Sequence, residues 1–163
     1  ECTIGGERCL FLKPTTFMNL SGQSVGEAVR FFKIDPAQDV VVVVDDLYLP
    51  TGAVRLRPGG GTGGHNGLES ITRLLGTDAY PRLRIGVGLL PDGGKPPFMD
   101  QADFVLGRFT DDEEPLLRGA LDKSIAAVET FVTRGLTHAM NQSNAGPRRE
   151  KKPPPTPGPP PAD

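Results

Sequence analysis

The sequence predicts an α/β fold, a three-layer α/β/α sandwich with a mixed central sheet. Strand and helix patterns alternate along the chain, which is typical of helices covering both faces of a sheet. Val40–Val44 is an unbroken apolar run, as expected for a central strand covered on both sides. Ala53–Arg57 alternates apolar and basic residues, which predicts a half-exposed strand that shows its arginines on one face. We expect the first strand and helix of this sheet to be missing.

Length and composition fit one globular domain of ordinary size. The chain has 163 residues, a formal net charge of −2 and 37% hydrophobic residues. It contains no apolar run of transmembrane length and no recognisable signal peptide, so we expect a cytoplasmic protein that does not contact a membrane. Residues 1–143 are assigned to the domain and residues 144–163 to a Pro-rich disordered tail. A solvated extension is favoured there over a polyproline ligand. Because the sequence starts at Glu1, two residues before a strand pattern, we expect an N-terminally truncated chain.

The first residues predict a β-hairpin. Cys2–Ile4 and Glu7–Cys9 flank a Gly-Gly pair, which is typical of a two-residue turn and sets Cys2 opposite Cys9. Reduced thiols are favoured over a disulfide. We expect Cys9–Leu12 to continue as a short apolar strand.

Each predicted helix begins at a residue that can cap it. Ser21 is expected to cap a helix reaching about Lys33, and Asn66 the next helix. Thr110–Glu113 is a capping box that opens a long helix ended by Gly135. A last short helix is expected near residues 137–143. Apolar residues at helical spacing predict one buried stripe on the first helix and one on the long helix. These are Val25, Ala28, Val29 and Phe32, then Leu117, Leu121, Ile125, Val128 and Val132.

Two chemically useful side chains end different elements. Asp45 follows the valine run, at the strand end where open α/β sheets place ligands. His65 ends the glycine-rich segment Gly59–Gly67. If they converge, a base and its orienting carboxylate would suit hydrolysis. A hydrogen-bonded structural histidine is the favoured alternative for His65, and His138 is interpreted as incidental.

The glycine-rich loop and the basic residues near it allow further interpretations. The loop has neither P-loop nor dinucleotide-binding spacing, so a nucleotide-binding module rests on glycine content alone, and a structural loop is the alternative. Arginines outnumber acids between Thr51 and Leu90. They form either a phosphate-facing patch or a solvated face. No cluster has zinc-site spacing, and no metal is expected.

Four blocks of the chain resemble the bacterial-type peptidyl-tRNA hydrolase family, in that family's order and spacing. The similarity runs from about Cys9 to Met140. The blocks are Lys13–Gly22, Val43–Gly52, Gly59–Leu68 and Arg82–Gly88. The resemblance implies hydrolysis of the ester bond of peptidyl-tRNA in translation, by a cytoplasmic monomer that needs no metal or cofactor.

The resemblance also implies a catalytic histidine base in a segment upstream of the Phe-Met-Asn block. Neither His65 nor His138 matches that position. Asp45 would orient the base and stabilise its protonated form. Tyr48 stands where the family often has an acid, and Thr62 where some members have a histidine.

Five further residues match substrate positions of the family. Asn19 and Asn66 would position water and the end of the peptide, since amides donate and accept hydrogen bonds without adding charge. Phe17 would line the site near the ester. Arg57 and Arg84 match positions near the tRNA phosphates, which arginine can grip bidentately.

The whole protein is therefore expected to be an esterase of peptidyl-tRNA and this chain by itself close to inactive. A non-catalytic RNA-binding role, as in the chloroplast intron-splicing relatives of the family, is the alternative.

Overall fold

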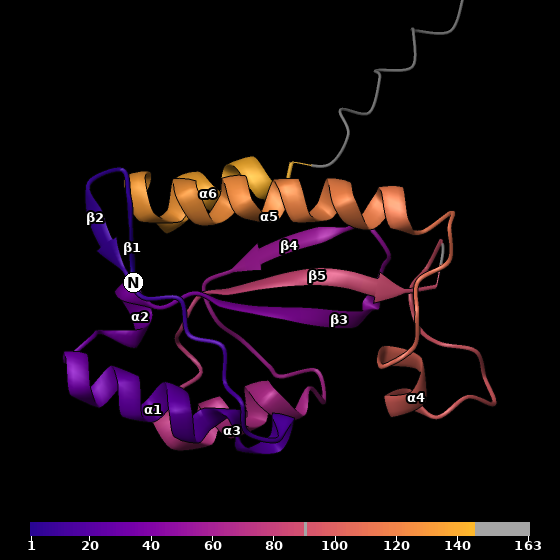
Figure 1. Ribbon diagram of the computed structural model, residues 1–163, viewed down its shortest axis with the longest axis horizontal. Coiled ribbons are helices and arrows are strands. Elements are labelled where there is room, and N and C mark those ends of the chain that lie inside the picture. The colour runs from indigo at the N-terminus through magenta and orange to yellow at the C-terminus, as the bar shows by residue number, and fades with distance from the viewer. Residues whose placement is uncertain (90, 146–163) are drawn as a thin grey trace, which may run out of the picture.

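The computed structural model describes residues 1–89 and 91–145 (Figure 1). From residue 146 onward the expected Pro-rich tail lies outside the described residues. The sheet consists of β3 (Val42–Pro50), β4 (Val54–Arg57) and β5 (Arg82–Gly88). The large helices are α1 (Ser21–Phe32), α3 (Asn66–Leu75), α5 (Glu114–Arg134) and α6 (Leu136–Ser143). The smaller elements are β1 (Cys2–Ile4), β2 (Glu7–Cys9), the 3-10 turn η1 (Met18–Leu20), α2 (Pro36–Asp39) and α4 (Gln101–Val105).

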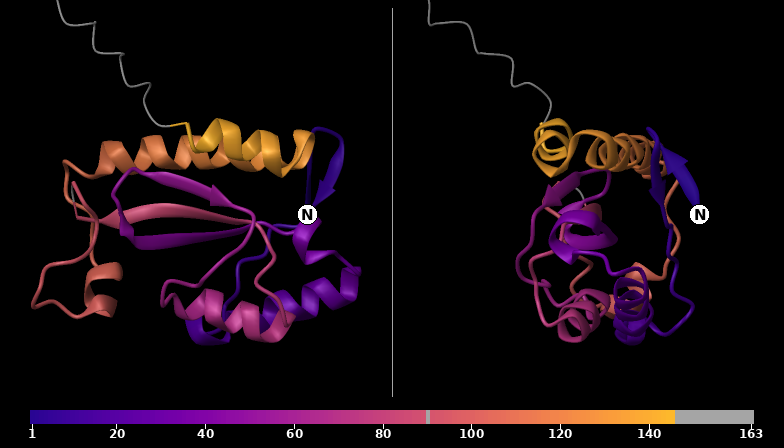
Figure 2. Two further views of the ribbon diagram at one scale, coloured as in Figure 1. Left: turned by 180° about the vertical axis from the view of Figure 1, so that it is seen from behind. Right: turned by 90° about the vertical axis from the view of Figure 1, so that its left-hand side faces the viewer.

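The strands of the sheet lie in the order β3-β5-β4. β5 runs parallel to β3 and antiparallel to β4, so the sheet is mixed. α1 and α3 cover one face, and α5 and α6 cover the other, as the end-on view in Figure 2 shows. The predicted α/β/α sandwich with a mixed sheet is confirmed.

The N-terminal hairpin is confirmed with its register, Cys2 opposite Cys9, and both thiols are free. Gly5 in its turn has φ +58°, and a Cβ there would collide with the Thr133 side chain of α5. The expected strand continuing to Leu12 is wrong, because β2 ends at Cys9 and the next residues form no ladder within the described chain.

Two predicted boundaries are corrected. β3 does not stop at Asp45 and Asp46 but runs on to Pro50, with a register shift against β5 after Asp46. Ser21 does not cap α1, whose N-cap is Leu20; the Ser21 hydroxyl instead donates to the Met18 carbonyl at 2.8 Å.

The capping prediction for α3 is also wrong, and that for α5 is half right. His65, not Asn66, is the N-cap of α3. Glu113 accepts a hydrogen bond from the Thr110 N–H at 2.9 Å, which is one half of the capping box, and α5 begins one residue later. Gly135 ends α5 with φ +82°, as expected.

The core lies in two clusters, one on each face of the sheet. Between the sheet and α5 and α6 it contains Leu56, Leu83, Ala127, Phe131 and Ala139. On the α3 side it contains Leu68, Ile71 and Tyr80. The stripe predicted for α5 is wrong in part: the buried positions are Ala120, Ser124, Ala127 and Phe131, whereas Leu121 and Ile125 are 45% and 58% exposed. Small side chains let α5 lie close to the sheet.

The stripe predicted for α1 is likewise only partly buried. Gly22 and Gly26 are its buried contacts with α3, where a Cβ on Gly22 would lie 2.2 Å from the Ser70 carbonyl oxygen. Val25 is half-buried, while Phe32 stays 48% exposed. The apolar side chains of α1 therefore turn toward a groove rather than into a closed core.

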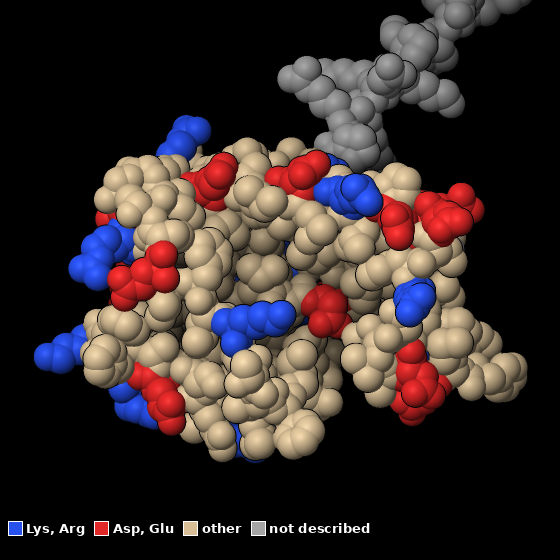
Figure 3. Space-filling view, viewed as in Figure 1, with Lys and Arg blue, Asp and Glu red and all other residues tan. Residues whose placement is uncertain are grey.

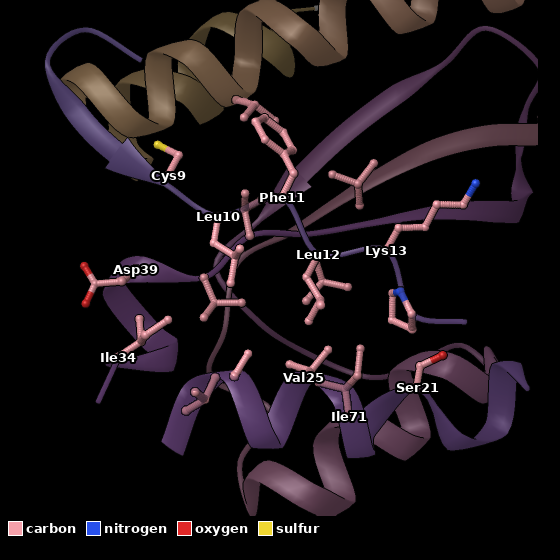
Figure 4. Close-up of a pocket in the computed structure, with 18 of the residues that line it drawn as sticks. Cys9, Leu10, Phe11, Leu12, Lys13, Ser21, Val25, Ile34, Asp39 and Ile71 are labelled. Carbon is pink, nitrogen blue, oxygen red and sulfur yellow. The ribbon is translucent and has the colours of Figure 1, made fainter. Parts of the chain in front are cut away.

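That groove, of about 930 Å³, lies along the outer edge of β3 (Figure 4). Its walls come from α1, from α5, from Leu10–Leu12 and from Val41–Val44. We call it the β3-edge groove. β3 is an edge strand, since it pairs only with β5 among the described strands.

Candidate functional site

The candidate site centres on a carboxylate and an imidazole that the fold brings together. Asp45 Oδ1 and His65 Nε2 lie 3.3 Å apart, although the residues are 20 positions apart in the chain. Asp45 comes from β3, and His65 stands at the end of the glycine-rich loop, where α3 begins. The convergence expected from the sequence is therefore present.

The His65 ring is fixed on its other side by the start of α3. Its Nδ1 accepts hydrogen bonds from the backbone N–H groups of Gly67, at 3.1 Å, and Leu68, at 3.3 Å. These are orphan donors that every helix leaves at its N-terminus. Gly67 gives the ring room, because a Cβ there would lie 3.0 Å from His65 Cε1 and 2.7 Å from Met18 Sδ.

The hydrogen bond from His65 lowers the pKa of the Asp45 carboxyl, although its partial burial acts in the opposite direction. Asp45 is therefore a carboxylate at neutral pH. Its side chain is 33% exposed, against 14% for His65. The carboxylate can thus face a second partner while the ring is nearly enclosed.

The two matching amides are exposed, and they stand on elements that adjoin His65. Asn19 lies on η1 and Asn66 is the first residue of α3, and η1 packs against α3. Neither amide forms a side-chain hydrogen bond within the described residues, so both are open to a ligand. Phe17, just before η1, is 81% exposed. Met18, to which we assigned no role from the sequence, lies against Gly67 beside the site. Its position between Phe17 and Asn19 could have indicated this.

The two matching arginines differ in what they contact. Arg57 is exposed on β4, on the same face as Arg55, as the alternating pattern predicted. Arg84 donates to Asp46 Oδ2 at 2.9 Å and to the Gly61 carbonyl at 2.7 Å. Arg57 can therefore meet a phosphate without losing an internal contact, and Arg84 cannot.

Arg82 is a residue whose place the sequence did not reveal. It is 1% exposed and donates to the carbonyls of Gly60 and Asp78, with its guanidinium 4.2 Å from the centre of the Tyr80 ring. Arg82 and Arg84 therefore hold the glycine-rich loop by its carbonyl groups. A phosphate cradle presents backbone N–H groups instead, so the contacts favour the structural interpretation of this loop over nucleotide binding.

Basic and acidic side chains are interspersed on the face shown in Figure 3. On this face, the mixture of charges favours the interpretation as a solvated surface over a phosphate-facing basic patch. In the part of the chain that the structure describes, no three His, Cys, Asp or Glu residues are grouped to hold a metal ion. None of the described helices has the length and apolarity that crossing a membrane requires.

The α/β sandwich brings a carboxylate and an imidazole into contact at its sheet, an arrangement suited to acid–base chemistry such as hydrolysis.

Comparison with known proteins identifies the family. A family model described as peptidyl-tRNA hydrolase matches residues 1–153. The peptidyl-tRNA hydrolase of Alkaliphilus oremlandii is 49% identical over 144 residues, covering 88% of this chain and 74% of the relative. That of Roseiflexus sp. is 46% identical over 152 residues, covering 93% and 68%. This chain belongs to the peptidyl-tRNA hydrolase family.

A solved structure supports the same assignment. The crystal structure of the Acinetobacter baumannii peptidyl-tRNA hydrolase matches with a TM-score of 0.71 at 38% identity. The match covers 81% of this chain and 64% of that one, so the chain spans less than two thirds of the solved protein. The resemblance seen from Cys9 to Met140 is confirmed and extends further along the chain. Both of these relatives are named as hydrolases of peptidyl-tRNA.

Proposed function

We propose that the protein containing this chain hydrolyses the ester bond of peptidyl-tRNA, releasing peptide and free tRNA. The observation that carries the proposal is the Asp45–His65 contact at 3.3 Å; the exposed amides of Asn19 and Asn66 stand on the elements that adjoin His65. These residues come from three of the sequence blocks that match the family. The contact between two of these blocks, at Asp45 and His65, supports a working site rather than a shared fold alone.

Asp45 has the role of orienting a general base. A carboxylate that binds an imidazole N–H holds the ring in one orientation and stabilises the imidazolium that forms when water is deprotonated. The lowered pKa of Asp45 supports this role, because the group stays charged throughout the neutral range. Asn19 and Asn66 position water and the peptide end, and Phe17 offers an apolar surface near the ester.

The base itself comes, in this proposal, from residues N-terminal to the 163. His138 does not supply it, because it lies on α6, across the sheet from α3. Its Nδ1 contacts the Arg134 carbonyl at the end of α5, at 3.0 Å. His65 has both ring nitrogens engaged. The family resemblance places the base upstream of Phe17, and the β3-edge groove offers apolar surface against which such a segment can pack.

Contact with the tRNA phosphates is assigned first to Arg57 and second to Arg84. Arg57 is exposed, while Arg84 already holds Asp46 and the glycine-rich loop. We also propose a cytoplasmic monomer, in keeping with a role in translation.

Asp45→Asn in the intact protein tests the proposed function. The wild type should release tRNA from peptidyl-tRNA, and the variant should lose roughly 10²- to 10⁴-fold in kcat, as expected when a catalytic base is no longer held in place. Asp92→Asn, on an exposed loop, is the matched control and should retain full activity. An intact protein that binds peptidyl-tRNA without hydrolysing it would overturn the proposal in favour of an RNA-binding role.

A further inference from the structure

The remaining feature is the ring of His65, which the proposed function leaves without a task. We propose that His65 is a positioning residue for Asp45: its Nε2–H fixes one carboxylate oxygen while its Nδ1 anchors the ring to α3. The inference rests on the proposed function, in which Asp45 orients the base. It assigns a role to a histidine that the family resemblance does not match to the base.

The hydrogen-bonding partners assign the tautomer. Nδ1 faces two backbone N–H donors, those of Gly67 and Leu68, so it must present a lone pair. A neutral imidazole carries one proton, which therefore lies on Nε2. Nε2 faces Asp45 Oδ1, an acceptor. Donor and acceptor match at every contact of the ring.

The same contacts exclude His65 as the base that activates water. A base needs a lone pair directed at the water, and the lone pair of Nδ1 already accepts two hydrogen bonds. Nε2 can offer no lone pair while it donates to Asp45. His65 acts on the reaction through the carboxylate.

Packing holds the ring in this orientation. The His65 side chain is 14% exposed, and the space beside it exists because Gly67 has no side chain. The start of α3 holds the imidazole at Nδ1, and the carboxylate holds it at Nε2. A precise site needs such support, because a poorly held orienting group lets the base move.

The neighbouring charges do not duplicate this contact. Asp46 and Arg84 are paired with one another at 2.9 Å. The Tyr48 side chain and the Thr62 hydroxyl also border the small pocket that contains Asp45. None of these groups forms a side-chain hydrogen bond to Asp45 among the described residues, so His65 is the side chain that fixes it.

Two substitutions separate the contact of His65 with Asp45 from its contact with the start of α3. In His65→Asn the amide oxygen takes the place of Nδ1 and can still cap α3, but nothing reaches Asp45. In His65→Gln the amide nitrogen takes the place of Nε2 and can donate to Asp45. In the intact protein we expect His65→Asn to lower kcat roughly 10- to 100-fold with little change in KM, as for other supporting residues of a site. We expect His65→Gln to recover most of that loss. His138→Asn is the matched control and should be silent.

The spectroscopic arm uses the 163-residue chain and needs no activity. Nitrogen-15 NMR should show the His65 proton on Nε2, with a shift that changes in Asp45→Asn. The pKa of Asp45, followed by carbon-13 NMR, should rise in His65→Asn and stay low in His65→Gln. A proton on Nδ1, or an Asp45 pKa unmoved by His65→Asn, would overturn the inference. So would a His65→Gln protein less active than His65→Asn. Failure of hydrolysis by the intact wild type would instead overturn the proposed function and leave the NMR result standing.

Discussion

The two edges of the sheet are completed in different ways. At the β4 edge, the Asn144 amide accepts from the Leu56 N–H at 2.8 Å and donates to the Leu56 carbonyl at 2.9 Å. That one side chain takes the place of a neighbouring strand. At the β3 edge, no described strand pairs, and Val43 is 50% exposed. The β4 edge is closed by described residues, whereas the β3 edge borders an apolar groove.

The difference explains why several predicted core residues are exposed. Leu10, Phe11 and Leu12 are 43%, 68% and 44% exposed, and all three line the β3-edge groove. The apolar stripe of α1 borders the same groove, as do Val128 and Val132 of the α5 stripe. An exposed apolar surface of this extent indicates a binding partner. We propose that it is filled by a strand and a helix from residues outside the 163, the strand and helix that we expected to be missing from this sheet.

The largest loss of stability should come from a substitution in the core between the sheet and helices α5 and α6. Leu83→Ala removes a side chain that is fully buried between the sheet and α5. It should lower the free energy of unfolding of this chain by about 2–5 kcal/mol, because a cavity remains. Urea denaturation measures the change.

Leu12→Ala is the matched control in the β3-edge groove, where the leucine is 44% exposed. It should cost less than about 1 kcal/mol in this chain. Equal losses from the two variants would show that the groove side is packed as tightly as the core and would break the comparison.

A smaller loss of stability should come from a substitution at the β4 edge of the sheet. Asn144→Ala leaves the Leu56 N–H and carbonyl without their partner and should lower the free energy of unfolding by about 1–3 kcal/mol. Hydrogen exchange at the Leu56 amide should also become faster. Asn141→Ala, exposed on the same helix, should change neither quantity. An unchanged Leu56 exchange rate in Asn144→Ala would contradict the edge-closing role.

Much of the fold could be predicted because it depends on local pattern. The Gly-Gly turn determined the register of the hairpin, and the strand at Arg82–Gly88 and the end of α5 at Gly135 were located correctly. The α5 face was missed because Ala120 and Ser124 are buried for their small size, which hydrophobicity does not reveal. Close packing selects residues by volume, and a sequence alone does not show where two elements approach.

The site was predicted in its residues but not in its contacts. Asn66 is a good capping residue, so nothing local indicated that His65 would cap α3 instead. The same ring also contacts Asp45, which lies on another element and is not visible in the local sequence. From the sequence, Arg82 and Arg84 were expected in a phosphate-facing patch or on a solvated face. In the structure, both donate to carbonyl groups of the glycine-rich loop. Charge counts cannot distinguish a solvated arginine from one that binds buried carbonyl groups.

We propose that this chain carries the orienting and substrate groups of a peptidyl-tRNA hydrolase, while the base and the filling of the β3-edge groove come from outside it. The most direct test compares hydrolysis of peptidyl-tRNA by the 163-residue chain and by the same chain extended by its own N-terminal residues. The extended protein should be faster by roughly 10²- to 10⁴-fold, the usual contribution of a general base. Hydrolysis by the 163-residue chain as fast as by the extended protein would contradict the account and place the base within residues 1–163.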